Sequence, residues 1–256
     1  MAQGVHATAI VEDGVQLGVG AVIHPGAIVR TGTVVGDAAI IHPYAVIGGE
    51  PQDLRFDPTT LSGVQIGARS TLREYVTVNR ATRPGQATTI GQECFLMAGV
   101  HLAHDVRLGD FVILANNVLL AGHVTVGERT FIGGGAAVHQ FCRVGEGAMV
   151  AGLARITLDV APFTMVAERD EVIGLNLVGL KRRALPRTTI QELKDLFRRV
   201  FYTPGNIRLI AAETLASQPV WAAESRRFLE FFAGGKRGFS RPRRGAATDG
   251  GEHADP

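Results

Sequence analysis

His104, Gly122 and Gln140 follow one another in this chain at intervals of three hexads. Each has a neighbour that can carry a proton, so the three pairs are His104-Asp105, Gly122-His123 and His139-Gln140. A lone exposed histidine is usually inert, but several polar groups aligned beside a carboxylate are typical of a functional site. These pairs can form one column only if one turn of backbone spans that same interval. The spacing therefore requires a fold with that repeat.

Such a fold is indicated by aliphatic residues at every sixth position. They run from Val5 to Ile47, resume at Ile66, and continue for twelve consecutive hexads from Ile90 to Ile156. A small or β-branched residue stands two positions before most of them. A period of six fits neither an α-helix nor an alternating strand, but it fits short strands joined by corners, with three hexads in each triangular coil. The sequence predicts a parallel β-helix over residues 1–162.

Two interruptions of the hexads predict loops that leave the prism. The first lies near residues 49–64, where the spacing from Ile47 to Ile66 is one residue longer than three hexads. The second lies near residues 80–88 and contains Pro and Gly. Loops on a rigid scaffold often carry binding groups.

Beyond residue 162 the hexads stop. We expect a connection over residues 163–180, an α-helical domain over 181–235 and a disordered tail over 236–256. Residues 190–201 have one apolar face at helical spacing. Thr189 and Glu192 have the spacing of a capping box at the start of that helix.

The charge of the chain is unevenly distributed. Residues 181–244 carry 15 Lys and Arg against five Asp and Glu, whereas residues 1–180 are mildly acidic. This asymmetry favours an acidic partner or a phosphate-bearing ligand. The sequence has neither an apolar run of transmembrane length nor the layout of a signal peptide, so we expect a cytoplasmic protein.

Other histidines and the two cysteines are interpreted as structural. His6, His24 and His42 also recur at three hexads and should stack on one edge, where they offer no tetrahedral metal centre. Cys94 and Cys142 are eight hexads apart and fall on different edges, too distant for a disulfide.

Six motifs give the chain a resemblance to a known family. They are PQDLR (51–55), HLAHD (101–105), ILANN (113–117), AGHV (121–124), AAVHQFC (136–142) and GLKRR (179–183). Together they resemble the UDP-N-acetylglucosamine 3-O-acyltransferases, which begin lipid A biosynthesis. The resemblance implies a left-handed prism, a hand that periodicity alone cannot give.

The resemblance also implies roles for individual residues. His104 would be the general base, Asp105 would orient it, and the Gly122 N–H would hold the oxyanion. Contacts to the sugar and diphosphate would come from Asp53, Arg55, His101, His123, His139 and Gln140. The nucleotide end would be held by Asn176, Arg182 and Arg183, and glycine at Gly152 would leave the acyl groove open for a long chain.

Partners follow from the same resemblance. The family is a homotrimer with sites between neighbouring prisms, and it takes its acyl group from an acyl carrier protein and transfers it to a UDP-amino sugar. An acidic carrier would suit the basic helical region. No metal, other cofactor or nucleic acid is expected, because the thioester is already activated.

The chain departs from the family pattern at three positions. Arg55 stands where lysine is common, Asn79 where histidine is usual, and Val178 where some members have a carboxylate. These changes raise the alternative that the acceptor is a UDP-3-amino sugar acylated on nitrogen.

Four further alternatives remain at this stage. A later N-acyltransferase of the same pathway usually has an extra N-terminal domain, for which the hexads starting at Val5 leave no room. An acetyl-CoA-dependent sugar transferase fits HLAHD and GLKRR poorly. Zinc carbonic anhydrases share the β-helix but need three converging histidines. The last alternative is a structural β-helix without catalysis.

Overall fold

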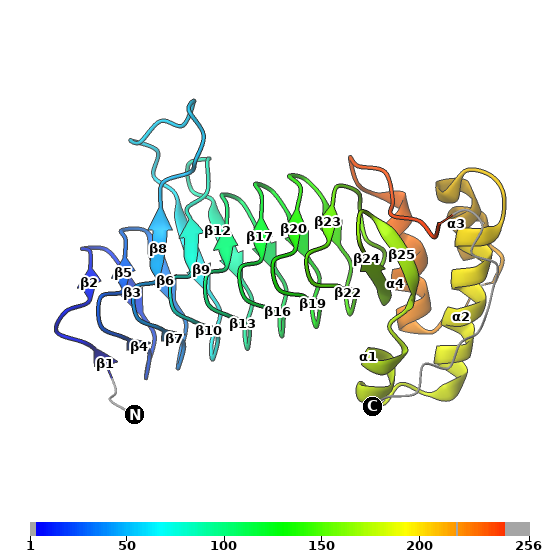
Figure 1. Ribbon diagram of the computed structural model, residues 1–256, viewed down its shortest axis with the longest axis horizontal. Coiled ribbons are helices and arrows are strands. Elements are labelled where there is room, and N and C mark those ends of the chain that lie inside the picture. Colours follow the sequence, from blue (N-terminus) through cyan, green and yellow to red (C-terminus); the bar gives the residue numbers. More distant parts are fainter. Residues whose placement is uncertain (1–3, 219, 244–256) are drawn as a thin grey trace.

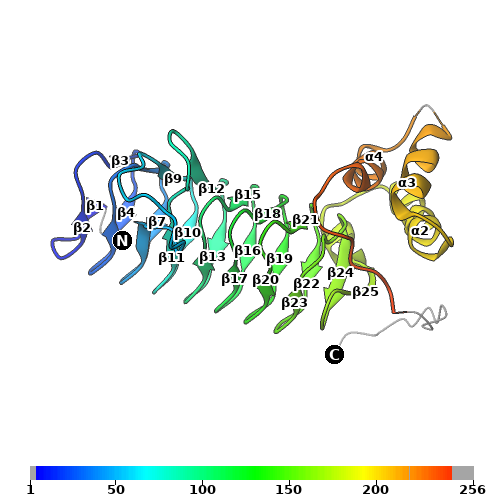
Figure 2. The same ribbon diagram turned by 90° about the horizontal axis from the view of Figure 1, so that it is seen from above.

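A computed structural model describes residues 4–218 and 220–243 of the chain. The main body is a parallel β-helix, as the hexads predicted, and it has the left hand that the family resemblance implied (Figure 1). Helices follow at its C-terminal end and lie to one side of the prism when the molecule is seen from above (Figure 2). No helix among these residues is long and apolar enough to cross a bilayer.

Each coil contributes one strand to each of three sheets, called here sheets A, B and C. Sheet A contains β1 (Gly4–Val5), β4 (Val22–Ile23), β7 (Ile40–Ile41), β10 (Thr71–Leu72), β13 (Phe95–Leu96), β16 (Ile113–Leu114), β19 (Phe131–Ile132), β22 (Met149–Val150), β24 (Thr164–Ala167) and β25 (Glu171–Leu175). Sheet B contains β2 (Ile10–Val11), β5 (Ile28–Val29), β8 (Val46–Gly49), β11 (Thr77–Asn79), β14 (His101–Leu102), β17 (Leu119–Leu120), β20 (Ala137–Val138) and β23 (Arg155–Ile156). Sheet C contains β3 (Gln16–Leu17), β6 (Thr33–Val35), β9 (Gly63–Ile66), β12 (Ala87–Ile90), β15 (Arg107–Leu108), β18 (Thr125–Val126) and β21 (Arg143–Val144).

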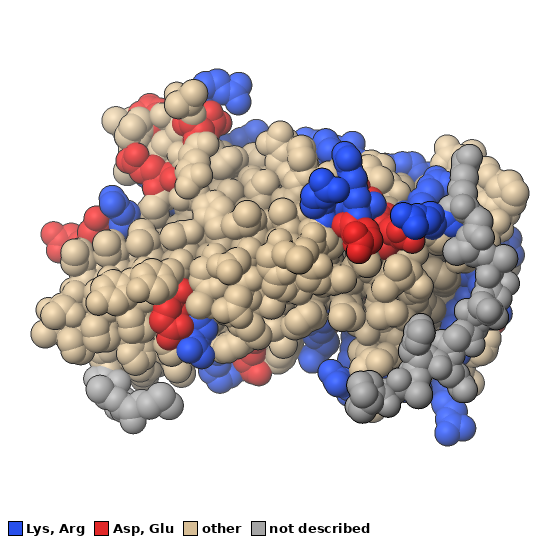
Figure 3. Space-filling view, viewed as in Figure 1, with Lys and Arg blue, Asp and Glu red and all other residues tan. Residues whose placement is uncertain are grey.

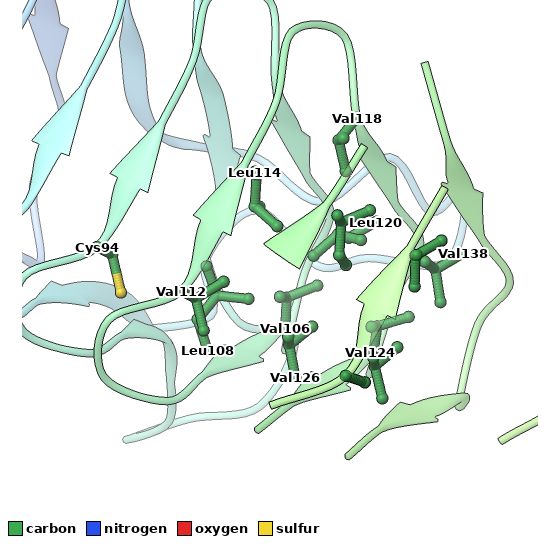
Figure 4. Close-up of a cluster of buried hydrophobic side chains, with 14 of the residues drawn as sticks. Cys94, Val106, Leu108, Val112, Leu114, Val118, Leu120, Val124, Val126 and Val138 are labelled. Carbon is green, nitrogen blue, oxygen red and sulfur yellow. The ribbon is translucent and has the colours of Figure 1, made fainter. Parts of the chain in front are cut away.

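The core is the interior of the prism. The hexad aliphatics from Ile23 to Ile156 are buried, and the small residues two positions earlier fill the space beside each corner. Figure 4 shows part of this interior, with Leu108, Leu114 and Leu120 among the side chains drawn. Cys94 and Cys142 are buried free thiols, as expected. Burial raises the pKa of Cys94 to about 11, which keeps it protonated and unreactive near neutrality.

The three outer faces differ in polarity. In each strand one residue points inward and its neighbour outward, so the outward residues form one column for each sheet. On sheet A the column is mostly apolar and includes Phe95, Ile113, Phe131, Met149 and Met165. On sheet B it is apolar through Leu119 and Ala137, whereas on sheet C it consists mainly of Gln, Thr and Arg.

The two expected loops lie side by side. Residues 50–62 project from the prism between β8 and β9, and residues 80–86 separate β11 from β12 (Figure 1). Arg80 joins them, because its guanidinium donates to the Pro58 carbonyl at 2.8 Å and lies 4.9 Å over the Phe56 ring.

The expected connection over 163–180 contains regular structure that the hexads did not predict. β24 continues sheet A in parallel, and β25 turns back antiparallel to it. Helix α1 (Leu177–Arg182) then begins four residues before the predicted boundary, because the Asn176 side chain accepts a hydrogen bond from Gly179 N–H at 2.9 Å and caps it.

Three further helices form the C-terminal domain. They are α2 (Arg187–Tyr202), α3 (Ile207–Ala216) and α4 (Ala223–Glu230), followed by the 3₁₀ turn η1 (Phe231–Ala233). The predicted apolar face of α2 packs inward through Leu193, Leu196, Phe197 and Val200. Aromatic rings of α4, η1 and residue Phe239 complete this second core.

The predicted capping box is wrong. Helix α2 begins earlier, with Pro186 at its N-cap, and Thr189 is buried inside the helix. The Glu192 carboxylate instead accepts hydrogen bonds from Ser225 Oγ at 2.6 Å and Ala222 N–H at 3.3 Å. It therefore stabilises the start of α4, because a helix N-terminus favours negative charge.

The prediction of a disordered tail from residue 236 is also wrong for the part that is described. Residues 238–241, called here the strap, run back along the end of the prism, where Asp159 N–H donates to Gly238 O and Ser240 N–H to Asp159 O. Phe239 and Ser240 are buried. These backbone bonds and the buried phenyl ring hold a segment whose composition suggested disorder. Residues 244–256 lie outside the described part of the chain.

Candidate active site

The residue pairs that recur at three hexads lie together at the corner between sheets B and C. His104-Asp105 joins β14 to β15, Gly122-His123 joins β17 to β18, and His139-Gln140 joins β20 to β21. Asp105 and His123 both have the left-handed backbone conformation, with φ of 60° and 61°. Other residues at prism corners share it, for example Asn117 at 60°, so the conformation belongs to the corner and not to the chemistry.

His104 and Asp105 form the hydrogen-bonded pair that the sequence suggested. His104 Nδ1 lies 2.8 Å from Asp105 Oδ2, and both side chains are largely buried. Thr82 donates its hydroxyl to the same carboxylate oxygen at 2.7 Å. Burial alone would raise the pKa of Asp105, but the hydrogen bonds from Thr82 and His104 outweigh it and lower the pKa. The carboxylate is thus ionised near neutrality and fixes the imidazole with Nε2 available as a base.

Gly122 faces the free nitrogen of this imidazole. A Cβ atom on Gly122 would lie 2.5 Å from His104 Cε1 and 2.7 Å from Nε2, so no side chain fits there. Within the described residues, the Gly122 N–H donates to no backbone or side-chain acceptor. The corner therefore places a free N–H donor beside a proton acceptor, which is the arrangement that an oxyanion intermediate needs.

His123 is held by a residue that the sequence reasoning missed. Its Nε2 lies 3.7 Å from Asp105 Oδ2, and its ring stacks on Phe141 with centroids 4.7 Å apart at 7°. Lys236 Nζ lies 5.4 Å from the centroid of the same phenyl ring. Burial lowers the pKa of His123, and Asp105 only partly opposes this. The signal was present, because Phe141 follows His123 by three hexads.

A groove of about 580 Å³ runs along this corner and across the face of sheet B. His101, His104, Gly122, His139 and Gln140 all line it. His101 Nδ1 lies 2.7 Å from Thr77 Oγ1, and burial lowers the His101 pKa, so the ring is neutral at physiological pH. His139 turns its Nδ1 toward the Gln140 carbonyl at 3.2 Å.

Asp53 and Arg55 lie on the projecting loop beside this groove. Asp53 Oδ1 accepts a hydrogen bond from Arg55 N–H at 2.9 Å, which is the main reason for its lowered pKa, and His104 adds a smaller electrostatic effect. The Arg55 side chain is 91% exposed. Asn79 is buried and donates to the Glu50 carbonyl at 2.8 Å. This departure from the family pattern therefore anchors the base of the loop.

Asn176, Arg182 and Arg183 form a separate cluster around α1, where they line a cavity of about 690 Å³ on the face of sheet A. Two of the three have structural contacts. Asn176 caps α1 and donates to Gly147 O at 3.0 Å, and Arg183 forms an ion pair with Glu146 at 2.5 Å. Arg182 is exposed, as is Val178 beside it. Within one chain this cluster does not line the His104 groove.

Gly152 lies at the corner between sheets A and B, three hexads after Gly134. It is exposed, and a Cβ atom there would lie 3.3 Å from the Gly134 carbonyl oxygen. A side chain at this position would therefore press on the backbone of the preceding coil. Gly152 lines neither of the two cavities described above.

A zinc enzyme was one of the alternatives left open by the sequence, and a metal would need converging ligands. His104, Asp105 and His123 have ligand atoms within 4.8 Å of one another. However, Asp105 Oδ2 already accepts hydrogen bonds from the Thr82 hydroxyl and from His104. This geometry suits an acid–base pair better than a metal, which would need those lone pairs.

The fold and the corner together define a class of protein, the hexapeptide-repeat transferases. Residues 87–122 match the family model of bacterial transferase hexapeptide repeats, and residues 159–240 match that of domain 2 of Udp N-acetylglucosamine O-acyltransferase. A relative from Agrobacterium fabrum, an acyl-[acyl-carrier-protein]–UDP-N-acetylglucosamine O-acyltransferase, is 37% identical over 78% of this chain and 74% of its own. The chain belongs to the UDP-N-acetylglucosamine O-acyltransferase family.

Solved structures agree with this membership. A UDP-N-acetylglucosamine acyltransferase from Campylobacter jejuni superposes with a TM-score of 0.82 at 34% identity, covering 94% of this chain and 100% of its own. The enzyme of the same name from Bacteroides fragilis gives a TM-score of 0.84 at 28% identity, with coverage of 92% and 99%. The resemblance drawn from the six motifs is thereby confirmed.

Proposed function

We propose that this protein transfers an acyl chain from acyl carrier protein to the 3-hydroxyl of UDP-N-acetylglucosamine, the first step of lipid A biosynthesis. The observation that supports the proposal is the arrangement of groups at the corner of His104. An imidazole oriented by a buried carboxylate faces a backbone N–H that no side chain can cover. Family membership names the two substrates, and the corner supplies the chemistry for joining them.

In the proposed reaction, His104 Nε2 takes the proton from the sugar hydroxyl as its oxygen attacks the thioester carbonyl. Gly122 N–H donates to the oxyanion of the tetrahedral intermediate. The intermediate then expels the thiolate of the carrier, which takes the proton from His104. Asp105 stabilises the imidazolium between these steps. The thioester is the activated group, so we propose that no cofactor takes part.

A homotrimer is proposed from the polarity of the outer faces. Sheets A and B present apolar columns and sheet C a polar one. Both apolar faces of one prism can be buried in a closed ring if face A of one copy packs on face B of the next, and we propose that three copies form this ring, as the family resemblance implies. This packing would bring the cluster with Arg182 opposite the groove of His104 and explain why the two are apart in one chain.

The carrier is proposed to dock on the helical domain. A groove between α1 and α2 is lined by Lys181, Arg187 and Lys194 together with Leu185 and Ile190. Positive side chains around an apolar floor suit an acidic helical partner. We place the protein in the cytoplasm, where its two soluble substrates would be.

The decisive experiment is an acyl transfer assay with purified protein and two acceptors. UDP-N-acetylglucosamine should accept the acyl group from acyl carrier protein, and His104→Ala should lower kcat by about 10²- to 10⁴-fold. His6→Ala, an exposed corner histidine far from the groove, should leave kcat unchanged. Faster transfer to the UDP-3-amino sugar would favour the alternative acceptor. Stoichiometric zinc with no acyl transfer would reject the proposal.

Acyl chain length gives a second readout. An open glycine corner is proposed to admit a long chain, so Gly152→Met should shift the preference toward shorter donors. A chain-length profile identical to that of the wild type would remove Gly152 from the acyl groove.

A further inference from the structure

The outward column of sheet B changes character along its length. Its strands are in register, so His101, Leu119, Ala137 and Arg155 are consecutive rungs. An isolated bridge then pairs Arg155 with Arg169. With roughly 4.8 Å between rungs, the two arginines lie about 14 and 19 Å from His101 along one face. The column therefore runs from imidazole through an apolar stretch to two arginines on adjacent rungs.

The groove of His104 continues into a second one along this column. Arg155 lines both grooves, and the second, of about 730 Å³, also contains Arg169, Arg241 and Arg243. Charged side chains gather where β23 and β25 lie, whereas the middle of the prism on the same view is almost without charge (Figure 3). The two grooves thus meet at Arg155, and together they are called the track here.

The balance of charge in this second groove leaves arginines available for a ligand. Among the residues that the structure describes, Arg155 and Arg169 have no carboxylate at ion-pair distance. Asp170 is engaged by Thr157, whose N–H donates to it at 2.6 Å, and Glu171 pairs with Arg243 at 3.5 Å. Glu168 is the remaining acidic group.

We propose that Arg155 and Arg169 bind a phosphate group of a substrate whose reacting end lies at His104. Paired guanidinium groups match phosphate oxygens in geometry and charge. The apolar rungs between them and the imidazole suit the uncharged part of an extended ligand. This assignment rests on the proposed function, because that function supplies two phosphate-bearing substrates.

The two sources of phosphate can be told apart. Acyl carrier protein holds its acyl group on a phosphopantetheine arm, with the thioester at one end and the phosphate at the other. UDP-N-acetylglucosamine has a diphosphate close to its sugar. The arm fits the track better, because its phosphate and its reactive carbon are separated by a long neutral chain, whereas the sugar is short.

The test compares small donors that differ only in the phosphate. Wild type, Arg155→Gln, Arg169→Gln and Arg107→Gln are assayed with acyl-phosphopantetheine and with acyl-pantetheine, while the UDP-sugar is varied separately. Arg107 is a matched control because it is an exposed outward arginine on sheet C. Calorimetric titration with phosphopantetheine and with pantetheine gives a readout that needs no turnover.

If the phosphate belongs to the phosphopantetheine arm, Arg155→Gln and Arg169→Gln should each raise the KM for acyl-phosphopantetheine about tenfold and weaken phosphopantetheine binding equally. The KM for acyl-pantetheine should not change. A rise confined to the KM of the UDP-sugar would assign the same site to the diphosphate. Unchanged constants for both substrates in Arg155→Gln and Arg169→Gln would overturn the proposal. Failure of the wild type to transfer any acyl group, with intact phosphopantetheine binding, would reject the proposed function alone.

Discussion

The corner of His104 and the cluster at α1 were predicted from the same kind of sequence motif, yet the structure uses their side chains differently. At the corner, His104, Gly122 and His139 line a groove, and the carboxylate of Asp105 orients the His104 imidazole. At α1, Asn176 caps the helix and Arg183 binds Glu146. A family motif therefore identifies important residues, but only their contacts show whether a residue acts on substrate or holds the fold together.

Among the variants that test this comparison, the largest effect should come from adding one methyl group at the corner. Gly122→Ala would put Cβ within 2.7 Å of His104 Nε2, and the imidazole would have to leave its position. Because φ of Gly122 is not in the left-handed region, the fold tolerates alanine. We expect kcat to fall about 100-fold, as for a small misplacement of a catalytic group. Gly134→Ala, at the equivalent hexad position, should retain wild-type kcat, and equal loss in both variants would contradict this account.

The α1 cluster should separate into structural and binding residues. Arg183→Gln breaks a largely buried ion pair and should lower the free energy of unfolding by about 1–3 kcal/mol. Arg182→Gln should leave unfolding unchanged and raise the KM for the UDP-sugar about tenfold if the exposed guanidinium contacts substrate. Denaturant titration and initial rates measure the two effects. A loss of stability in Arg182→Gln would show that Arg182, like Arg183, has a structural role.

A smaller effect is expected from Phe141, which positions His123 by stacking. Phe141→Leu should reduce kcat/KM about two- to tenfold, the worth of one aromatic contact. Phe141→Tyr keeps the stacked ring and should restore the wild-type value. If leucine and tyrosine behaved alike, the aromatic face would have no part in holding the imidazole.

The smallest effect concerns pH. Burial lowers the pKa of His101, so the unfolded chain takes up a proton as pH falls below about 6.5 while the folded chain does not. Stability from this group is therefore complete above that pH and declines as pH falls toward the folded pKa. His101→Gln should flatten the dependence of unfolding free energy on pH between 7.5 and 5.5. An unchanged slope would show that His101 is not held neutral.

Periodicity predicted the β-helix and the column at its corner because a hexad leaves no other way to bury its aliphatic residues. It could not predict β25, the start of α1 or the strap, since these depend on single contacts such as the Asn176 cap and the buried Phe239. The misplaced capping box has the same origin. Glu192 was read with its own helix, but its partners Ser225 and Ala222 lie on or before a different helix, α4.

Within the site, spacing predicted which residues share an edge but not what each one touches. Asp105 was identified by its place in the sequence, whereas Thr82, which fixes it, lies on a loop that breaks the repeat. Phe141 lies three hexads after His123, but it was not chosen as a site residue because a phenyl ring cannot transfer a proton. The bonds of Asn176 and Arg183 became visible only in three dimensions.

A parallel ladder that ends in an open edge invites further strands, from the same protein or another. Here the last parallel strand, β24, is covered by β25 running the opposite way, and the strap pairs beyond it through Glu171 and Arg241. Because β25 runs antiparallel to β24, the end of sheet A does not offer a parallel strand edge to which the coil of another prism could pair. We infer that β25 and the strap protect this end of the rod against end-to-end fibre growth, a role independent of catalysis.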